Sequence, residues 1–281
     1  AERRYDEART EFERALALGP RTPEALQGLV RALLATNRRG EALQRLAALA
    51  AAEPQHALPL VIQGDLLYQD RRHVDAEKAY AAAAERAPTW WLPVRGRALV
   101  AVARGDRAAA IALLEAALPK VAEPLAVRAE LAAQYEAAAR VDDAVRQYEE
   151  ILRVSPNALL AANNLAMLLV THRADRASLQ RADALVAPLA DSRNPNYLDT
   201  YGWVKLRNGD AATARAALER AVALAPDMAI ARYHLAMAQL ATARSEEARR
   251  SLVAALASAE AYPGRREAEL ALDRLGGPPR S

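Results

Sequence analysis

Apolar and polar residues follow a helical pattern along the whole chain, and small residues recur in it at a fixed spacing. Apolar residues three, four and seven positions apart form one face of a helix. Alanines stand 34 residues apart at Ala8, Ala42, Ala76, Ala110 and Ala144. Prolines with the same spacing are Pro20, Pro54 and Pro88, with Pro156 two periods later. Because proline cannot continue a helix interior, each marks a turn into the next unit. The pattern predicts an all-α chain of repeated helix pairs.

The 34-residue period predicts seven full repeats of two antiparallel helices each. The repeats begin near Pro23, Ala57, Trp91, Leu125, Leu159, Pro195 and Ala229. Residues 1–20 supply only a second helix, whose partner is expected to precede residue 1. A last helix over residues 265–275 has the place of a C-terminal cap. Residues 276–281 are expected to form a flexible tail, so the repeats and the cap make a single domain over residues 1–275.

The fifth repeat departs from this spacing. Its alanine, Ala182, lies 38 residues after Ala144. This difference predicts that the turn around residues 171–178 is longer by about one turn of helix. Pro188 falls late in the second helix of the repeat, and we expect it to bend or end that helix.

Composition and charge restrict the possible functions. The 38 basic and 35 acidic residues are interspersed and leave a net charge of only +3. This pattern is typical of solvated helix faces and argues against a nucleic-acid-binding stripe. The chain has no cysteine, which excludes disulfides, thiolate metal sites and cysteine nucleophiles. It also lacks a run of about 18 apolar residues, so no transmembrane segment is expected.

Signals of catalysis are weak throughout the sequence. The four histidines, His56, His73, His172 and His234, lie in separate repeats without a second ligand at metal spacing. We expect them to be surface or capping residues. Adjacent carboxylates such as Glu149 and Glu150 point apart on a helix and make a poor acid–base pair. The sequence therefore predicts a protein that is not an enzyme and has no cofactor and no metal site.

The repeat resembles a known superfamily. Residues 125–158 and 195–228 carry the small, aromatic and proline positions of the tetratricopeptide repeat, which has a 34-residue period. The resemblance covers essentially the whole chain. It implies a right-handed α–α superhelical solenoid whose first helices line a concave groove. It also implies a non-catalytic protein–protein interaction scaffold that binds a peptide or partner protein in that groove.

The superfamily's contact positions give ten candidate partner-binding residues in this chain. They are Arg31, Asp65, Tyr68, Arg95, Asn163, Met167, Asp199, Trp203, Tyr233 and Met237. Aromatic, methionine and amide side chains suit an extended peptide or a partner helix. Tyr68 and Tyr233 are expected to form a rim with free hydroxyls, whereas Trp203 could equally fill the space between repeats six and seven. A clamp for a C-terminal carboxylate would use Arg31 and Arg95, but the matching asparagines are missing.

The C-terminal repeats carry a narrower resemblance. It rests on residues 160–166, 194–204, 231–236 and 256–263, which include the run from Asp199 to Trp203. These segments resemble bacterial envelope tetratricopeptide proteins tied to exopolysaccharide production and PEP-CTERM sorting. The resemblance implies a periplasmic or envelope-associated scaffold, although a cytoplasmic location stays open. Alternatives are a polysaccharide-contacting module and the recruiting solenoid of a larger enzyme, and self-association is also open.

Overall fold

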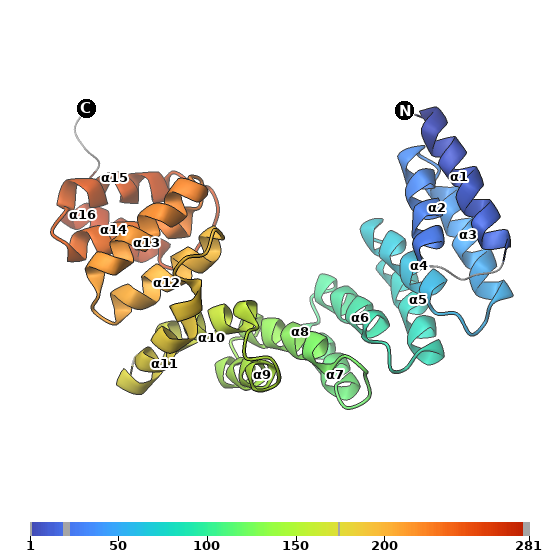
Figure 1. The fold of residues 1–281 in the computed structure, drawn as a ribbon, viewed down its shortest axis with the longest axis horizontal. Helices are drawn as coiled ribbons and strands as arrows, with labels where there is room; N and C mark the ends of the chain where they lie inside the picture. The colour runs from blue at the N-terminus through green and yellow to red at the C-terminus, as the bar shows by residue number, and fades with distance from the viewer. Residues whose placement is uncertain (1, 19–22, 174, 278–281) are drawn as a thin grey trace. The chain divides into compact units, whose positions relative to one another are not determined.

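The chain folds into helices alone in the part that the structure describes, residues 2–18, 23–173 and 175–277 of a computed structural model (Figure 1). These ranges hold sixteen α-helices, one short 3₁₀-helix and no strand. Successive helices pack against each other in pairs, such as α1 with α2, α4 with α5 and α12 with α13. The expected all-α fold of paired helices is therefore confirmed. None of the described helices is both long and apolar enough to cross a lipid bilayer.

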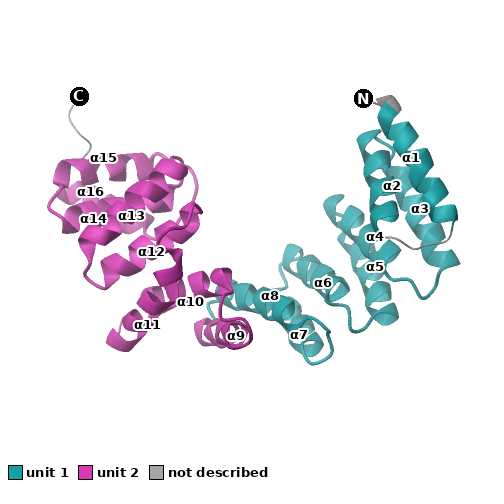
Figure 2. Ribbon diagram, in the orientation of Figure 1, with its two compact units in different colours: residues 1–140 teal, residues 141–281 magenta. Residues whose placement is uncertain are grey.

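The chain forms two compact units, residues 1–140 and residues 141–281 (Figure 2). The boundary falls between the two helices of the fourth predicted repeat. Each unit is described by itself below. That the two units make up one continuous domain over residues 1–275 stays a prediction.

Unit 1 contains the first eight helices. They are α1 (Glu2–Ala17), α2 (Pro23–Ala35), α3 (Arg39–Ala52), α4 (Leu58–Gln69), α5 (His73–Arg86), α6 (Trp91–Ala103), α7 (Arg107–Ala117) and α8 (Pro124–Ala137). The first helix of each repeat begins within one residue of the position that the 34-residue period indicates. Buried leucines and alanines of α2, α3 and α4 form one core cluster, and those of α4, α5 and α6 form the next.

Unit 2 contains the remaining helices. They are α9 (Val141–Val154), α10 (Leu159–His172), α11 (Arg176–Val186), the 3₁₀-helix η1 (Ala187–Leu189), α12 (Pro195–Arg207), α13 (Ala211–Leu224), α14 (Ala229–Ala241), α15 (Ser245–Leu256) and α16 (Arg265–Arg274). Helix α16 packs on α15 at the end of the unit. Of the predicted tail, residues 278–281 lie outside the described residues.

The fifth repeat differs from its prediction in one respect. Helix α10 ends at His172 and α11 begins at Arg176, so the turn between them is as short as the turn between α4 and α5. The prediction of a longer turn there was wrong. Most of the added spacing lies inside α11, because Ala182 is the seventh residue of this helix whereas Ala144 is the fourth residue of α9. Pro188 lies in η1 directly after the end of α11, which confirms that it ends this helix.

Glycines allow neighbouring helices of unit 1 to approach closely around Tyr80. A Cβ atom on Gly64 or Gly96 would lie 2.6 Å or 2.4 Å from the Tyr80 ring, closer than atoms can pack. Tyr80 itself is 1% exposed, and its hydroxyl donates a hydrogen bond of 2.6 Å to Asp65. The tyrosine from α5 is thus held between two first helices, α4 and α6.

Candidate partner-binding site

The first helices of repeats six and seven bring polar and aromatic side chains together in unit 2. Asp199 and Trp203 are one helical turn apart on α12, so they share a face. Tyr233 and His234 lie on α14, which contacts α12 directly. We call Asp199, Trp203, Tyr233 and His234, with Tyr262 from the segment before α16, the Trp203 cluster.

The indole of Trp203 lies on the imidazole of His234. The two ring centroids are 4.0 Å apart, and the ring planes differ by only 17°. His234 Nδ1 lies 2.8 Å from Asp199 Oδ1, and both side chains are 4% exposed. Because an ionised carboxylate can only accept, the Nδ1–H group donates this bond and fixes the imidazole orientation. Asp199 therefore orients His234, and His234 supports the indole.

Trp203 itself is only half-buried and stands beside a cation. The Arg207 guanidinium, one turn further along α12, lies 5.8 Å from the indole centroid. Tyr233 lies on the other side, with its centroid 6.0 Å from that of Trp203. An apolar surface with an adjacent positive charge is thus open at this turn of α12. Such a surface can accept an apolar side chain and an acidic neighbour from a partner.

Tyr233 packs inside unit 2 and is 6% exposed. Its ring is 6.1 Å from that of Tyr262, and a Cβ atom on Gly264 would lie 2.3 Å from it. Burial, together with the nearby Glu267 and Tyr262, raises the pKa of Tyr233, while Arg207 lowers it. The exposed rim expected at Tyr233 is therefore absent, because the segment before α16 covers the ring.

Three further candidate residues belong to unit 2: one lies near the cluster, and two lie on the first helix of the preceding repeat. Met237 is half-buried and packs against the core that includes Tyr233. Asn163 and Met167, on α10, occupy the places in their repeat that Asp199 and Trp203 occupy in theirs. The Asn163 amide donates to Asn164, which in turn donates to the Tyr148 hydroxyl at 2.9 Å. Asn164 thus links α10 to Tyr148 of α9.

The candidates of unit 1 form a separate group. Asp65 is exposed as a whole residue, but its carboxylate accepts the hydrogen bond from Tyr80 and is partly desolvated. The desolvation raises the pKa of Asp65, whereas the bond from Tyr80 and the charge of Arg95 lower it. Arg95 lies 6.0 Å from the Trp91 ring. Tyr68 is half-buried and meets His73 edge-on, with centroids 5.6 Å apart. Arg31 is exposed on α2. Asp65 and Arg95 are therefore close enough to interact, whereas Arg31 stands on an earlier helix.

Sequence reasoning missed His234. It was expected to be a surface or capping residue, and this was wrong, because His234 is 3% exposed. One signal could have found it. Asp199 and His234 are 35 residues apart, one period plus one residue, which places them on neighbouring first helices. No group of three His, Asp or Glu side chains in the described ranges could hold a metal ion.

Comparison with known proteins identifies the repeat. The tetratricopeptide repeat family matches residues 1–60 and 205–263. No curated protein matches the sequence. A chain of the APC/C hetero-tetramer Cut9–Hcn1 is 15% identical and aligns over 96% of this chain and 52% of its own length, with a TM-score of 0.62. This chain thus spans about half the length of that relative.

Two other solved structures are similar over most of their own lengths. A tetratricopeptide repeat protein from Parabacteroides merdae is 16% identical, with 91% of this chain and 99% of that chain covered and a TM-score of 0.59. YrrB, described as a tetratricopeptide protein with an unusual peptide-binding site, is 18% identical, with 66% and 95% covered and a TM-score of 0.51. At these identities the likeness is one of fold. Residues 1–60 and 205–263 thus match the tetratricopeptide repeat family, and the chain has the tetratricopeptide-repeat fold.

Proposed function

We propose that this chain is a non-catalytic interaction scaffold that holds a peptide or partner protein on the first helices of unit 2, with Trp203 as the anchor. The observation that carries the proposal is the support beneath the indole. Trp203 is half-buried and stacked at 4.0 Å on His234, whose orientation Asp199 fixes. Tryptophan is enriched among residues that dominate interface energies. An indole that is already ordered loses little conformational freedom on binding, which favours affinity.

The neighbouring candidates would extend the contact. Asn163 and Met167 on α10, and Met237 on α14, offer an amide and two adaptable thioethers on the first helices that contact α12. In unit 1, Arg31, Asp65, Tyr68 and Arg95 would contact a partner in the same manner on their own first helices. YrrB, whose description mentions a peptide-binding site, supports a peptide as the class of ligand.

We place this scaffold in a bacterial envelope assembly for exopolysaccharide, in the periplasm or attached to the envelope. The support is the resemblance of residues 160–166, 194–204, 231–236 and 256–263 to proteins of such assemblies. The partner would then be another protein of the same assembly. A direct contact with polysaccharide is the alternative, because an indole beside amide groups also suits a sugar ring.

The test is a pull-down from bacterial envelope extract with the parent chain, Trp203→Ala and Trp91→Ala. Trp91 is the matched control, since it also carries an arginine one turn later, at 6.0 Å from its ring, but lies in unit 1. We expect the parent and Trp91→Ala to capture the same protein, and Trp203→Ala to lose at least nine-tenths of it. Far-ultraviolet circular dichroism must show all three chains equally helical.

Two outcomes would contradict the proposal. Equal capture by Trp203→Ala would move the interaction away from α12. Alternatively, saturable quenching of tryptophan fluorescence by millimolar oligosaccharide, abolished in Trp203→Ala and unaccompanied by any captured protein, would assign the cluster to a glycan instead.

A further inference from the structure

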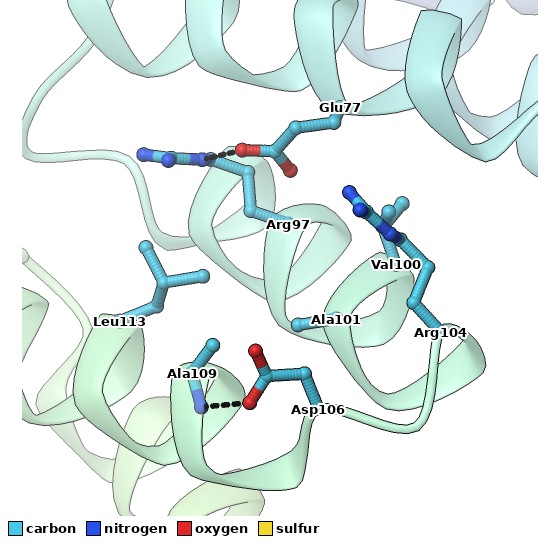
Figure 3. Close-up of a pocket in the computed structure, with 8 residues that line it drawn as sticks. All are labelled: Glu77, Arg97, Val100, Ala101, Arg104, Asp106, Ala109 and Leu113. Atoms are coloured by element: carbon cyan, nitrogen blue, oxygen red, sulfur yellow. Dashed lines mark hydrogen bonds and ion pairs between the residues drawn. The ribbon is translucent and has the colours of Figure 1, made fainter.

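Unit 1 has a second surface, formed by three adjacent cavities on helices α3 to α7. The first, of about 420 Å³, has an apolar floor of Leu43, Leu60 and Leu67. The second, of about 390 Å³, shares Arg72 and Asp75 with the first. The third, of about 440 Å³, shares Arg104 with the second and lies over α5, α6 and α7 (Figure 3). Because neighbouring cavities share lining residues, they lie side by side on one surface, which we call the outer furrow.

The outer furrow lies on a different helix face from the candidate groove residues. On α4, Gln63 lines the furrow and Asp65 is a candidate groove residue. On α6, Arg97 lines the furrow and Arg95 is a candidate groove residue. Residues two apart on an α-helix point about 200° apart, since each residue turns the helix by about 100°. A partner in the outer furrow would therefore leave the groove residues of these helices free.

The acidic side chains of the outer furrow already have partners. Asp75 pairs with Arg72 at 2.7 Å, and Glu77 pairs with Arg97 at 2.7 Å. Asp106 accepts a 2.9 Å hydrogen bond from the Ala109 amide, as Figure 3 also shows. The carboxylates in this surface are thus neutralised by their neighbours or used in the fold.

Three basic side chains of the outer furrow remain unpaired. Arg71, Lys78 and Arg104 are all exposed, and their side chains have no hydrogen-bond or ion-pair partner among the described residues. Figure 3 shows Arg104 at the cavity without a link to Glu77 or Asp106. Lys78 lines the first cavity, Arg71 lines the second, and Arg104 lines both the second and the third. Leucines form the floor of the first cavity. The surface is therefore complementary to a negatively charged chain that also carries apolar groups.

We infer that the outer furrow binds an extended acidic segment of a partner protein. Its carboxylates pair with Arg71, Lys78 and Arg104, and its aliphatic side chains pack on the half-buried Leu43 above the buried Leu60 and Leu67. A nucleic acid fits less well, because phosphate-tracking sites use a larger number of cations and the furrow alternates its cations with carboxylates. This second site is independent of the Trp203 cluster, so the chain would hold two partners or two parts of one.

The probe is a fluorescein-labelled peptide of alternating glutamate and leucine, blocked at both ends, added to the full chain at low salt. We expect saturable fluorescence polarisation that weakens as ionic strength rises, because exposed charges are screened. Lys78→Glu/Arg104→Glu should bind at least tenfold more weakly. The matched control Lys120→Glu/Arg250→Glu changes the net charge equally at two exposed basic residues outside the furrow and should bind within about twofold of the parent.

Further arms separate this site from others. Trp203→Ala should bind the probe as the parent does, so failure here and failure of the proposed function are distinguishable. The milder Lys78→Gln/Arg104→Gln should weaken binding to an intermediate degree and guards against misfolding of the double glutamate. Absence of saturable binding, or equal weakening by both charge-reversed pairs, would overturn the inference. Tighter binding of a single-stranded oligonucleotide of equal charge, lost in Lys78→Glu/Arg104→Glu, would also overturn it and assign the surface to nucleic acid.

Discussion

At the scale of single residues, the Trp203 cluster joins the buried pair Asp199 and His234 to the half-buried indole of Trp203. The carboxylate of Asp199 and the imidazole of His234 are buried together at 2.8 Å, and the imidazole also contacts the rings of Trp203 and Tyr233. A buried donor without an acceptor is costly, because it has lost its water. The stability of this pair and the order of Trp203 are therefore linked.

Asp199→Ala tests this link. The substitution leaves the His234 Nδ1–H group without its acceptor, so we expect the free energy of unfolding to fall by about 1–3 kcal/mol. The emission of Trp203 should shift to longer wavelength as the indole loses its support, measured in a Trp90→Phe/Trp91→Phe background. Asp199→Asn keeps an acceptor oxygen and is the control, with a smaller loss. An unchanged spectrum in Asp199→Ala would show that His234 does not need this carboxylate.

The site was predictable from the sequence only in part, and single residues show why. The repeat register indicated Asp199, Trp203, Tyr233 and Met237 as neighbours, and the structure brings them together. The register could not indicate that Tyr233 is covered, because the covering segment around Gly264 has no helical period and a left-handed φ of 90°. It also gave no weight to His234, since a lone histidine has no partner in a pattern of apolar positions.

At the scale of helices, the turn inside six of the seven repeats has one residue in the left-handed region; the turn of the fifth repeat includes residue 174, which lies outside the described residues. The left-handed residue is Gly105 or Gly209 in two repeats, and it is Asn37, Arg71, Ala139 or Ala243 in four others. The following residue closes the helix end; for example, the Arg244 amide donates to the Gln239 carbonyl at 2.8 Å. Left-handed backbone is strained for a residue with a Cβ atom and unstrained for glycine. The sequence predicted these turns from their place in the period, even where glycine is absent.

Ala243→Gly should therefore stabilise the protein. We expect the free energy of unfolding to rise by about 1 kcal/mol, because glycine removes the strain at the φ of 60°. Ala216→Gly, at an exposed position within α13, is the matched control and should lower it by about 1 kcal/mol. Urea unfolding followed by circular dichroism measures both. A loss of stability in Ala243→Gly would mean that the turn relaxes in solution.

Helix α13 shows how a cap couples a helix to pH. Asp210 precedes it, and its carboxylate accepts from the Thr213 amide at 3.1 Å. Two hydrogen bonds from Thr213 lower the pKa of Asp210 below its value of 3.8 in the unfolded chain. The bond from the Thr213 side chain has the larger effect and the bond from its amide the smaller one. A lowered pKa in the folded state stabilises the fold above pH 4 and ceases to do so as pH falls through the folded pKa.

Asp210→Ala should accordingly lower the free energy of unfolding by about 1 kcal/mol at pH 6 to 7, the usual effect of removing an N-cap. The difference from the parent should shrink as pH falls below 4, since the parent then loses the charged form of its cap. Asp210→Asn keeps the cap but not the charge, so its difference from the parent should be small and should vanish at low pH. Midpoints of urea unfolding at pH 7 and pH 3.5 provide the comparison. A pH-independent difference for Asp210→Ala would exclude any role for the charge.

At the scale of the whole molecule, contacts are local along the chain. Every pair of described helices with a substantial interface consists of neighbours or next neighbours in sequence, such as α4 with α5 and α4 with α6. The stability of such an array is approximately a sum of terms for each repeat and its neighbours. A substitution in unit 1 should therefore leave unit 2 as stable as before.

Gly96→Ala provides the test. A Cβ atom there would lie 2.4 Å from the Tyr80 ring, so we expect a loss of about 1–3 kcal/mol from overpacking. Hydrogen exchange of amides should accelerate in α4, α5 and α6 and stay unchanged in α12 to α15. Gly40→Ala, where no atom lies within 4 Å of the added Cβ, should change neither region adversely. Equal acceleration in both units would show that the chain unfolds as one block.

The locality of the contacts also has a consequence for how the protein is made. Helical proteins dominated by short-range contacts fold in microseconds to milliseconds. Ribosomes add about 5–20 residues per second, so residues 141–281 are made over roughly 7 to 28 seconds after unit 1 is complete. Unit 1 draws its core from its own helices. It can therefore reach its folded form on the ribosome and present the outer furrow to a partner before Trp203 has been synthesised.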